Sequence, residues 1–269
     1  MLVNIFSNIV SAIILVILVL EMQIIGAFYA LAINQIFSLL INIMLFFIYK
    51  PFEIGWVFKQ FVYENLKKLS SFSVMAVVGP TCLIISTFIV RDFIFTEFGS
   101  DYAGSWEAMW RISAIYLLFL ITTFKFYLIP TFSKLNNNEL KKEVFKIWKV
   151  VIPIIIIITA GVYITKDLII NILLSEEFML INTIIFFHLL GDVIKINCWV
   201  LGNIMISKAD TKSFIFFQIE WSVVFVALTY LFISKYGFVG VSISYFITYI
   251  IHFSLLNLYF RKLLWTNKD

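Results

Sequence analysis

Residues 2–49 read LVNIFSNIVSAIILVILVLEMQIIGAFYALAINQIFSLLINIMLFFIY, two apolar runs (2–20 and 24–49) separated by the short gap Glu21–Gln23. A helix needs about 20 predominantly apolar residues to cross the hydrocarbon core of a bilayer. The stretch is therefore long enough for two crossings, and the gap marks the point where the chain turns back. It predicts a pair of transmembrane helices.

Six more runs of the same kind follow, which brings the predicted number of membrane spans to eight. They cover residues 71–90, 105–131, 147–165, 179–206, 213–233 and 236–260. Of all residues, 62% are apolar and 13% are charged, and the mean hydropathy is +1.02. This composition lies far outside the range of soluble domains. The chain is therefore predicted to be an all-α integral membrane protein with eight transmembrane helices.

Lysine and arginine are concentrated in alternate gaps between the runs. The second, fourth and sixth gaps and the C-terminal tail hold fourteen of the twenty basic residues, whereas the third, fifth and seventh gaps hold three. Short loops that are rich in Lys and Arg remain in the cytoplasm, so we expect both termini there. The same loops explain the net charge of +4, because they face anionic lipid headgroups. The charge therefore does not indicate a nucleic-acid partner.

The second gap (51–70) has a pattern of its own. Its large apolar side chains recur at near-helical spacing between polar residues; they are Phe52, Trp56, Phe61, Leu66 and Leu69. An amphipathic segment of this kind lies along the membrane surface. We predict an interfacial helix on the cytoplasmic side, with a simple loop that carries aromatic anchors as the alternative.

The gaps predicted to lie outside the cytoplasm are short, and the longest covers about residues 91–104. No folded extramembrane domain fits into them, and the sequence shows no Gly-rich phosphate loop or cluster of metal ligands. Cys82 and Cys198 lie within spans and are interpreted as small apolar residues. We therefore expect no cofactor and no metal, and a transporter rather than an enzyme with a catalytic loop.

Charged side chains inside a membrane span are costly and need a partner, a water-filled cavity or a function. His188, Asp192 and Lys195 follow one another at spacings of 4 and 3, so they lie on one helix face. The second spacing allows an ion pair between Asp192 and Lys195. We favour a polar stripe that lines a central cavity, because an ion pair costs desolvation energy that apolar residues avoid. The alternative is a self-neutralising pair that holds helices together.

The run 105–131 contains Glu107, Arg111 and Lys125. Lys125 is close to the inner end of the run, where its long side chain can reach the membrane surface, so we interpret it as structural. Glu107 and Arg111 are four residues apart near the outer end. A guanidinium binds phosphate oxygens in a bidentate way that lysine cannot match. If the substrate carries a diphosphate, Arg111 is a candidate to hold it.

The last two runs carry a further acid and a further stripe. Glu220 is interpreted as a lone buried acid, either a proton or cation site or a protonated and silent group. Tyr245, Tyr249 and His252 recur at i, i+4 and i+7. Such stripes usually face lipid or the protein core. A contact with a glycan is the minority interpretation, which rests on the stacking of sugars on aromatic rings.

The sequence resembles the Wzx-type O-antigen flippases and the closely similar flippase for the enterobacterial common antigen lipid. Both are members of the multidrug/oligosaccharidyl-lipid/polysaccharide exporter superfamily. The phrases that carry the resemblance are GSWEAMWRISAIY (104–116), LIPTFSKL (128–135), VVIP (150–153), TKDLIINILLSEEF (165–178), LLGDVIKINCWVLG (189–202), ISKAD (206–210) and YGFVGVSISYFITYIIHFSLL (236–256). At Ala114, where many relatives carry an acidic residue, no site role is transferred.

The resemblance implies a transporter with two six-helix lobes around a cationic central cavity. Residues 71–269 would form the second lobe and residues 1–50 the last two helices of the first, with 51–70 as the cytoplasmic linker between them. About four N-terminal helices of such a paired-repeat fold have no counterpart in this chain. We therefore expect a partial two-lobe exporter fold.

The function implied is the flipping of undecaprenyl-diphosphate-linked O-antigen repeat units across the bacterial inner membrane, with the polyprenyl tail left in lipid between the lobes. Membrane lipid and other O-antigen assembly proteins are the expected partners. The alternatives are a flippase for the enterobacterial common antigen lipid, a membrane O-antigen polymerase, and an inactive truncated remnant. The candidate residues of the substrate path are Glu107, Arg111, His188, Asp192, Lys195 and Glu220.

Overall fold

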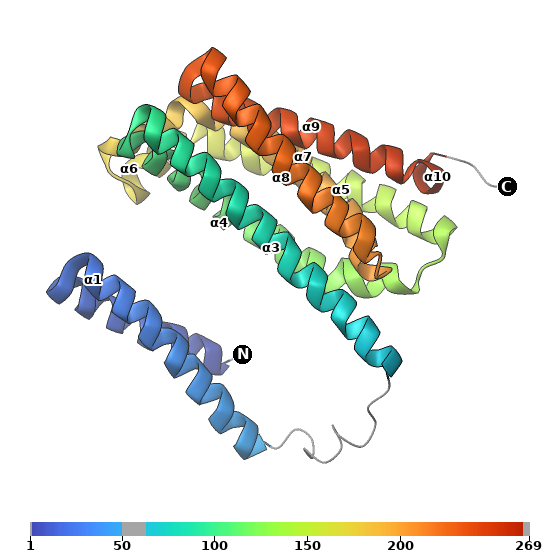
Figure 1. Cartoon of the computed structure of the whole chain (residues 1–269), viewed down its shortest axis with the longest axis horizontal. Coiled ribbons are helices and arrows are strands. Elements are labelled where there is room, and N and C mark those ends of the chain that lie inside the picture. The colour runs from blue at the N-terminus through green and yellow to red at the C-terminus, as the bar shows by residue number, and fades with distance from the viewer. Residues whose placement is uncertain (1, 50–62, 266–269) are drawn as a thin grey trace. The chain divides into compact units, whose positions relative to one another are not determined.

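A computed structural model describes residues 2–49 and 63–265 of the chain (Figure 1). The chain divides into two compact units, Met1–Asn65 and Leu66–Asp269, and each is described by itself. The described residues form helices and short connections, in agreement with the predicted all-α class. Of the predicted linker helix 51–70, residues 51–62 lie outside the described ranges, and Tyr63 is already the first residue of a long helix.

The first unit contains the helix α1 (Leu2–Tyr49), which reverses direction at Gln23. The backbone of Gln23 has φ 51° and ψ −130°, which no α-helix accommodates. Ser11 Oγ donates a hydrogen bond of 2.6 Å to Asn34 Oδ1, so the two arms lie antiparallel. Gly26 makes the turn possible, because a Cβ atom there would collide with the backbone of the other arm. The turn falls in the gap that separates the first two apolar runs.

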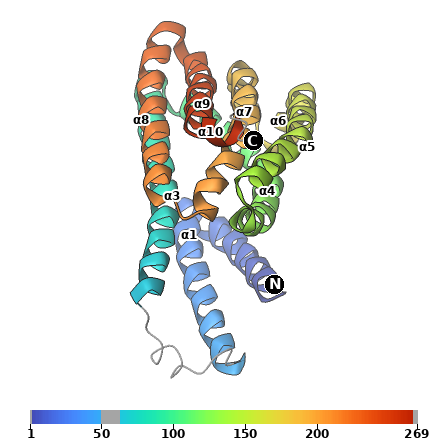
Figure 2. The same cartoon turned by 90° about the vertical axis from the view of Figure 1, so that its right-hand side faces the viewer.

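The second unit is a bundle of six long helices with shorter helical segments between them (Figures 1 and 2). Its elements are α3 (Tyr63–Phe98), α4 (Ser100–Lys134), α5 (Asn137–Ile164), α6 (Lys166–Leu173), η1 (Glu176–Leu180), α7 (Ile181–Ser207), α8 (Thr211–Tyr236), η2 (Gly237–Val239), α9 (Gly240–Tyr259) and α10 (Arg261–Leu264).

Six segments of the described chain are long and apolar enough to cross a membrane. Two of them, Val10–Ile48 and Thr211–Tyr259, each contain a reversal, at Gln23 and at Gly237. Each of the eight predicted runs therefore corresponds to a helix or to one arm of a hairpin. The protein is an all-α membrane protein.

Local capping fixes where the helices of the bundle begin. Asn136 and Glu139 form a capping box at the start of α5: Asn136 Oδ1 accepts from the Glu139 backbone at 3.0 Å, and Glu139 Oε2 accepts from the Asn136 backbone at 3.1 Å. Asp210 caps α8 by accepting from the Ser213 backbone at 3.3 Å. At the other end of α8, Gly237 adopts φ 62°, which glycine tolerates at little cost.

The helix α7 lies at the centre of the bundle, with α4, α5 and α9 packed against it (Figure 2). A helix that is apolar on all sides is a buried one. Fifteen of the residues of α7 are buried, on every face of the helix. The helix α8 packs against α9 on one side, and α3 runs beside α8, where the rings of Phe93 and Tyr230 meet at a tilt of 43° with their centroids 4.1 Å apart. Any charged residue of α7 is therefore enclosed by its neighbours.

Contacts at the two ends of the bundle establish its internal topology. At one end, Lys208 Nζ donates to the backbone oxygen of Leu135 at 2.9 Å, so the fourth and sixth gaps of the sequence meet. At the opposite end, Tyr102 packs edge-on against Phe238 at 4.9 Å, so the third and seventh gaps meet. The fourth and sixth gaps, both rich in basic residues, thus share one end, as alternate crossing of the membrane requires. Which end faces the cytoplasm stays a prediction.

Candidate functional site

Asp192 is the centre of a buried polar cluster that links three helices of the bundle. Its side chain is 0% exposed. Oδ1 accepts a hydrogen bond of 2.7 Å from the hydroxyl of Tyr245 on α9. Oδ2 accepts from two residues of α4, Ser113 at 2.6 Å and Tyr116. Together with His188 and Lys195 of α7, these residues are called the Asp192 cluster below.

Lys195 supplies the positive charge of the Asp192 cluster. Its Nζ lies 3.6 Å from Asp192 Oδ1 and donates to the Tyr245 hydroxyl at 3.0 Å. The ion pair predicted from the i,i+3 spacing is therefore present. The ammonium group also lies over the rings of Trp110 at 4.9 Å and Trp199 at 5.3 Å. These cation–π contacts stabilise a charge that is cut off from water.

His188 occupies the other side of the cluster and stacks on Tyr245, with the ring centroids 4.3 Å apart and the planes at 8°. Its Nε2 lies 3.9 Å from Asp192 Oδ2, and neither ring nitrogen has a hydrogen-bond partner among the described residues. Gly191 makes room for this stack. A Cβ atom at Gly191 would lie 2.5 Å from Cδ1 of Tyr245, so a larger residue there would displace the tyrosine.

The cluster lies within the packed interior of the six-helix unit. His188 and Asp192 are 0% exposed and Lys195 is 7% exposed. The sequence alone favoured a polar stripe along a cavity. Within this unit the residues instead form the alternative arrangement, a self-neutralising pair that holds helices together. A place for these residues in a substrate path stays a prediction.

Sequence reasoning did not find Ser113, Tyr116 or Tyr245 as partners of Asp192. Ser113 is 79 positions away and Tyr245 is 53 positions away, and pairing over such distances leaves no periodic signal. The available signal was the aromatic stripe that begins at Tyr245. It was interpreted as core or lipid-facing, and the structure places Tyr245 in the core at 1% exposure.

Arg111 and Glu107 lie on the opposite, exposed face of α4. Arg111 Nε donates to Glu107 Oε1 at 3.0 Å, and Nη2 lies 2.9 Å from the same oxygen. The two side chains are 78% and 36% exposed. Thr122 and Lys125 are also exposed on this helix, at spacings from Arg111 that keep them on about the same face. The structure thus separates the predicted residues into an enclosed cluster and an exposed stripe.

Glu220 was expected to be a lone acid, and this expectation is wrong. Its Oε2 lies 2.6 Å from Nδ1 of His252, which comes from the neighbouring helix α9. Both side chains are about nine-tenths buried, at 9% and 10% exposure. The pair was missed because the two residues are 32 positions apart, on the two arms of the α8–α9 hairpin. Like the Asp192 cluster, it joins helices within the second unit.

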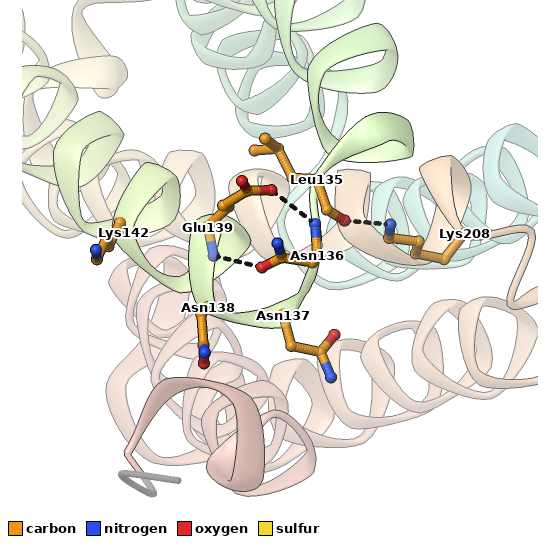
Figure 3. A pocket seen from close by; sticks show the side chains of 7 residues that line it. All are labelled: Leu135, Asn136, Asn137, Asn138, Glu139, Lys142 and Lys208. Atoms are coloured by element: carbon orange, nitrogen blue, oxygen red, sulfur yellow. Dashed lines mark hydrogen bonds between the residues drawn. The ribbon is translucent and has the colours of Figure 1, made fainter. Parts of the chain in front are cut away.

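A hollow of about 770 Å³ lies at the connection between α4 and α5 (Figure 3). Its lining residues are Leu135, Asn136, Asn137, Asn138, Glu139, Lys142 and Lys208. As Figure 3 shows, Glu139 and Lys208 are engaged in the capping box and in the bond to Leu135. The hollow belongs to the end of the bundle that carries the basic gaps. Among the described residues, no group of three or more His, Cys, Asp or Glu is placed to hold a metal.

The fold is that of a known class of helical membrane proteins. A crystal structure of MATE in complex with MaL6 and one of a MATE mutant superpose with TM-scores of 0.74 and 0.72, each at 13% identity. Each match covers 96% of this chain and 62% of the other. At this identity the likeness shows the fold alone, which is MATE-like.

Residues 1–182 match the polysaccharide biosynthesis protein family, and the chain belongs to that family. Lipid III flippases of Escherichia coli (strain K12) and Shigella flexneri are each 30% identical over 189 residues. The aligned part is 70% of this chain and 45% of each relative, so the match spans less than half of their length. The resemblance to lipid-linked oligosaccharide flippases is confirmed, and with it the prediction of a transporter family rather than an enzyme.

Proposed function

We propose that this protein takes part in flipping undecaprenyl-diphosphate-linked O-antigen repeat units from the cytoplasmic to the periplasmic leaflet of the bacterial inner membrane. The observation that carries the proposal is the match to lipid III flippases over 70% of the chain. Lipid III, the cargo in the names of these relatives, is the second candidate substrate. Because the match covers 45% of the relatives, the activity of the whole protein is part of the proposal.

A flippase must move a glycan and a diphosphate through a hydrocarbon core about 30 Å thick. Charged side chains exposed on a membrane helix are costly unless they face a polar path. The exposed stripe of α4 carries such groups, with Arg111 and Glu107 towards one end and Lys125 towards the other. From Arg111 to Lys125 the helix rises about 21 Å, most of the thickness of the core. We place the path of the polar headgroup along this stripe.

Arg111 is suited to hold the diphosphate. Its fork of N–H donors matches the oxygens of a phosphate, and its charge is permanent. Its partner Glu107 is itself about one-third exposed, so the ion pair is screened by solvent and is easily exchanged for a phosphate. A weak partner of this kind permits both capture and release.

The Asp192 cluster has a supporting role in this proposal. Ser113 and Tyr116 bind Asp192 from the inner face of the same helix that presents Arg111 on its outer face. Asp192 and Lys195 therefore fix the position and rotation of α4 relative to α7. A direct contact of Asp192, Lys195, His188 or Glu220 with the substrate requires the bundle to open.

The test is complementation of two bacterial strains, one without its O-antigen flippase and one without its lipid III flippase. We expect the chain, expressed at matched membrane abundance, to restore surface O-antigen in the first strain. Restoration in the second strain alone would identify lipid III as the cargo. Restoration in neither strain, with the protein present in the membrane, would contradict the proposed function.

A further inference from the structure

An apolar groove runs between α5 and α7 on the surface of the six-helix unit. Its volume is about 460 Å³. Its floor consists of the buried side chains of Thr159 and Leu189, and its rims are exposed except at two half-buried residues of α7, Leu190 and Val193. The rim residues are Ile156, Ala160, Tyr163, Phe186, Leu190 and Val193. Both helices are candidate membrane spans, so the groove opens towards lipid.

The lining offers nothing to a polar ligand along most of its length. The Thr159 hydroxyl donates to the backbone oxygen of Ile155 in its own helix, at 2.8 Å. An apolar lining of this kind offers water almost no hydrogen-bond partner. A cavity of about 150 Å³ accommodates benzene, so by proportion 460 Å³ accommodates about 18 carbon atoms. The groove therefore has the size of one hydrocarbon chain.

The groove has a direction, because its two walls are in register. Ile156 and Val193 lie at its deep end, and Tyr163 and Phe186 meet edge-on at its outer end, with ring centroids 5.8 Å apart. The helix α5 ends one residue after Tyr163, so the outer end reaches the membrane surface. From Ile156 to Tyr163 the helix rises about 10 Å.

The ammonium group of Lys166 lies at the outer end of the groove. Lys166 Nζ lies over the Tyr163 ring, 4.9 Å from its centroid. The neighbouring carboxylate of Asp167 accepts a hydrogen bond of 2.9 Å from Asn182, and Lys166 has no ion-pair partner in the part of the chain that the structure describes. The charge is thus placed to receive an anion at the point where the apolar lining ends.

From this arrangement we infer that the groove between α5 and α7 binds the isoprenoid tail of a polyprenyl phosphate or diphosphate at a site separate from Arg111, with Lys166 paired to its phosphate. The inference rests on the proposed function and assigns the tail of that substrate class a site on the protein. A polyprenyl phosphate has one chain bonded directly to the phosphate, which matches one groove that ends at one cation. The chain of a phospholipid is joined to its phosphate through glycerol ester carbonyls. The apolar lining has few hydrogen-bond donors for these carbonyls, so it suits a phospholipid less well.

The test uses the whole chain in phosphatidylcholine vesicles with a photoreactive farnesyl diphosphate as the probe. After irradiation, the labelled peptides are mapped by mass spectrometry. We expect labelling concentrated in residues 156–163 and 186–193, with competition by unlabelled farnesyl diphosphate and little competition by dioleoyl phosphatidylglycerol. Equal competition by the phospholipid, or labelling spread over all lipid-facing helices, would overturn the proposal.

Two variants with a matched control sharpen the result. Ala160→Trp fills the groove and should abolish labelling there, whereas Ile157→Trp, on a 71% exposed position of the same helix outside the lining, should leave it unchanged. Lys166→Gln should weaken competition by farnesyl diphosphate about fivefold and leave labelling by a photoreactive farnesol unaltered. An unchanged response of Lys166→Gln would remove the phosphate contact from the proposal.

The assay measures binding and is independent of transport. If the groove is labelled but the chain restores no glycan display, the proposed function is contradicted and the proposed binding site still holds. If the unaltered chain restores glycan display but its groove is not labelled, only the proposed binding site is contradicted.

Discussion

The Tyr245 hydroxyl donates a hydrogen bond of 2.7 Å to Oδ1 of Asp192, which ties α9 to α7 inside the bundle. The same hydroxyl accepts from Lys195 at 3.0 Å. Asp192 therefore has three hydroxyl donors besides the lysine, whereas the ammonium of Lys195 depends on one carboxylate and one hydroxyl. The two members of the ion pair are not equivalent, and their removal should have unequal effects.

The first prediction concerns this asymmetry. Asp192→Ala leaves an uncompensated buried cation, which costs about 3–5 kcal/mol. Lys195→Ala should cost less, because three hydroxyls still bind the carboxylate. The double variant should be more stable than Asp192→Ala alone, by about 0.5–3 kcal/mol. Thermal unfolding of the purified proteins in detergent measures all three, and simple additivity would show that the two residues act separately.

A second prediction compares two glycines of α7. Gly191→Ala places a Cβ 2.5 Å from the Tyr245 ring and should destabilise the protein by about 1–3 kcal/mol. Gly202→Ala meets no atom within 4 Å and should stabilise by up to about 1 kcal/mol through helix propensity. Denaturation midpoints of the two variants provide the comparison. If both substitutions had the same sign, the close packing of Tyr245 on Gly191 would be wrong.

The third prediction separates function from stability at Arg111. Its side chain is 78% exposed, so Arg111→Ala should change stability by less than about 1 kcal/mol. In a complementing protein Arg111→Ala should abolish O-antigen display. Arg111→Lys should retain part of the display, because lysine keeps the positive charge but lacks the bidentate geometry of the guanidinium. Arg91→Ala, at another exposed arginine, is the matched control and should display normally. Normal display by Arg111→Ala would remove this residue from the path.

A fourth prediction concerns orientation in the membrane. Reporter fusions at Lys142 and at the C-terminal tail should report the cytoplasm, and a fusion at Glu176 should report the periplasm, because the basic gaps meet at one end of the bundle. Opposite signals from Lys142 and the tail would contradict alternate crossing. A periplasmic signal from both, with a cytoplasmic one from Glu176, would show that the protein has the opposite orientation in the membrane. The fold would be unaffected.

The last prediction is a pH dependence at the start of α8. Partial burial raises the pKa of Asp210, but hydrogen bonds from Tyr259 at 2.6 Å and from Ser213 outweigh this effect, so its pKa lies below the usual 3.8. A carboxyl group whose pKa is lower in the folded than in the unfolded state stabilises the fold at pH values above its unfolded-state pKa. This contribution is lost as the pH falls through the folded-state pKa.

Asp210→Asn keeps a capping side chain and removes the charge, so it isolates this contribution. The difference in melting temperature between wild type and Asp210→Asn should be constant from neutral pH down to about pH 5 and should shrink below about pH 4. The effect should be small, because solvent screens a half-exposed charge. A difference that grows on acidification would contradict the predicted sign.

The sequence by itself determined the membrane class, the eight helical segments and the alternation of the gaps between the two ends of the second unit. These properties depend on local composition: a run of about 20 apolar residues crosses a bilayer wherever it occurs, and the placement of lysines in short loops orders the crossings. The reversal at Gln23 falls in the predicted gap, and the ion pair of Asp192 with Lys195 follows from spacing within one helix. The family resemblance was also carried by short phrases of sequence.

Only the tertiary structure decided which helix faces are enclosed. In a soluble protein the polar face of a helix reveals the buried one, but in a membrane protein both lipid and core are apolar, so periodicity does not distinguish them. For this reason the stripe of Asp192 was expected to line a cavity, whereas the structure encloses it between α4 and α9. Glu220 pairs with His252 of a different helix, which periodicity within one helix does not reveal. Arg111 and Ser113, two positions apart in the sequence, were placed on opposite faces of α4 by the packing of that helix against α7.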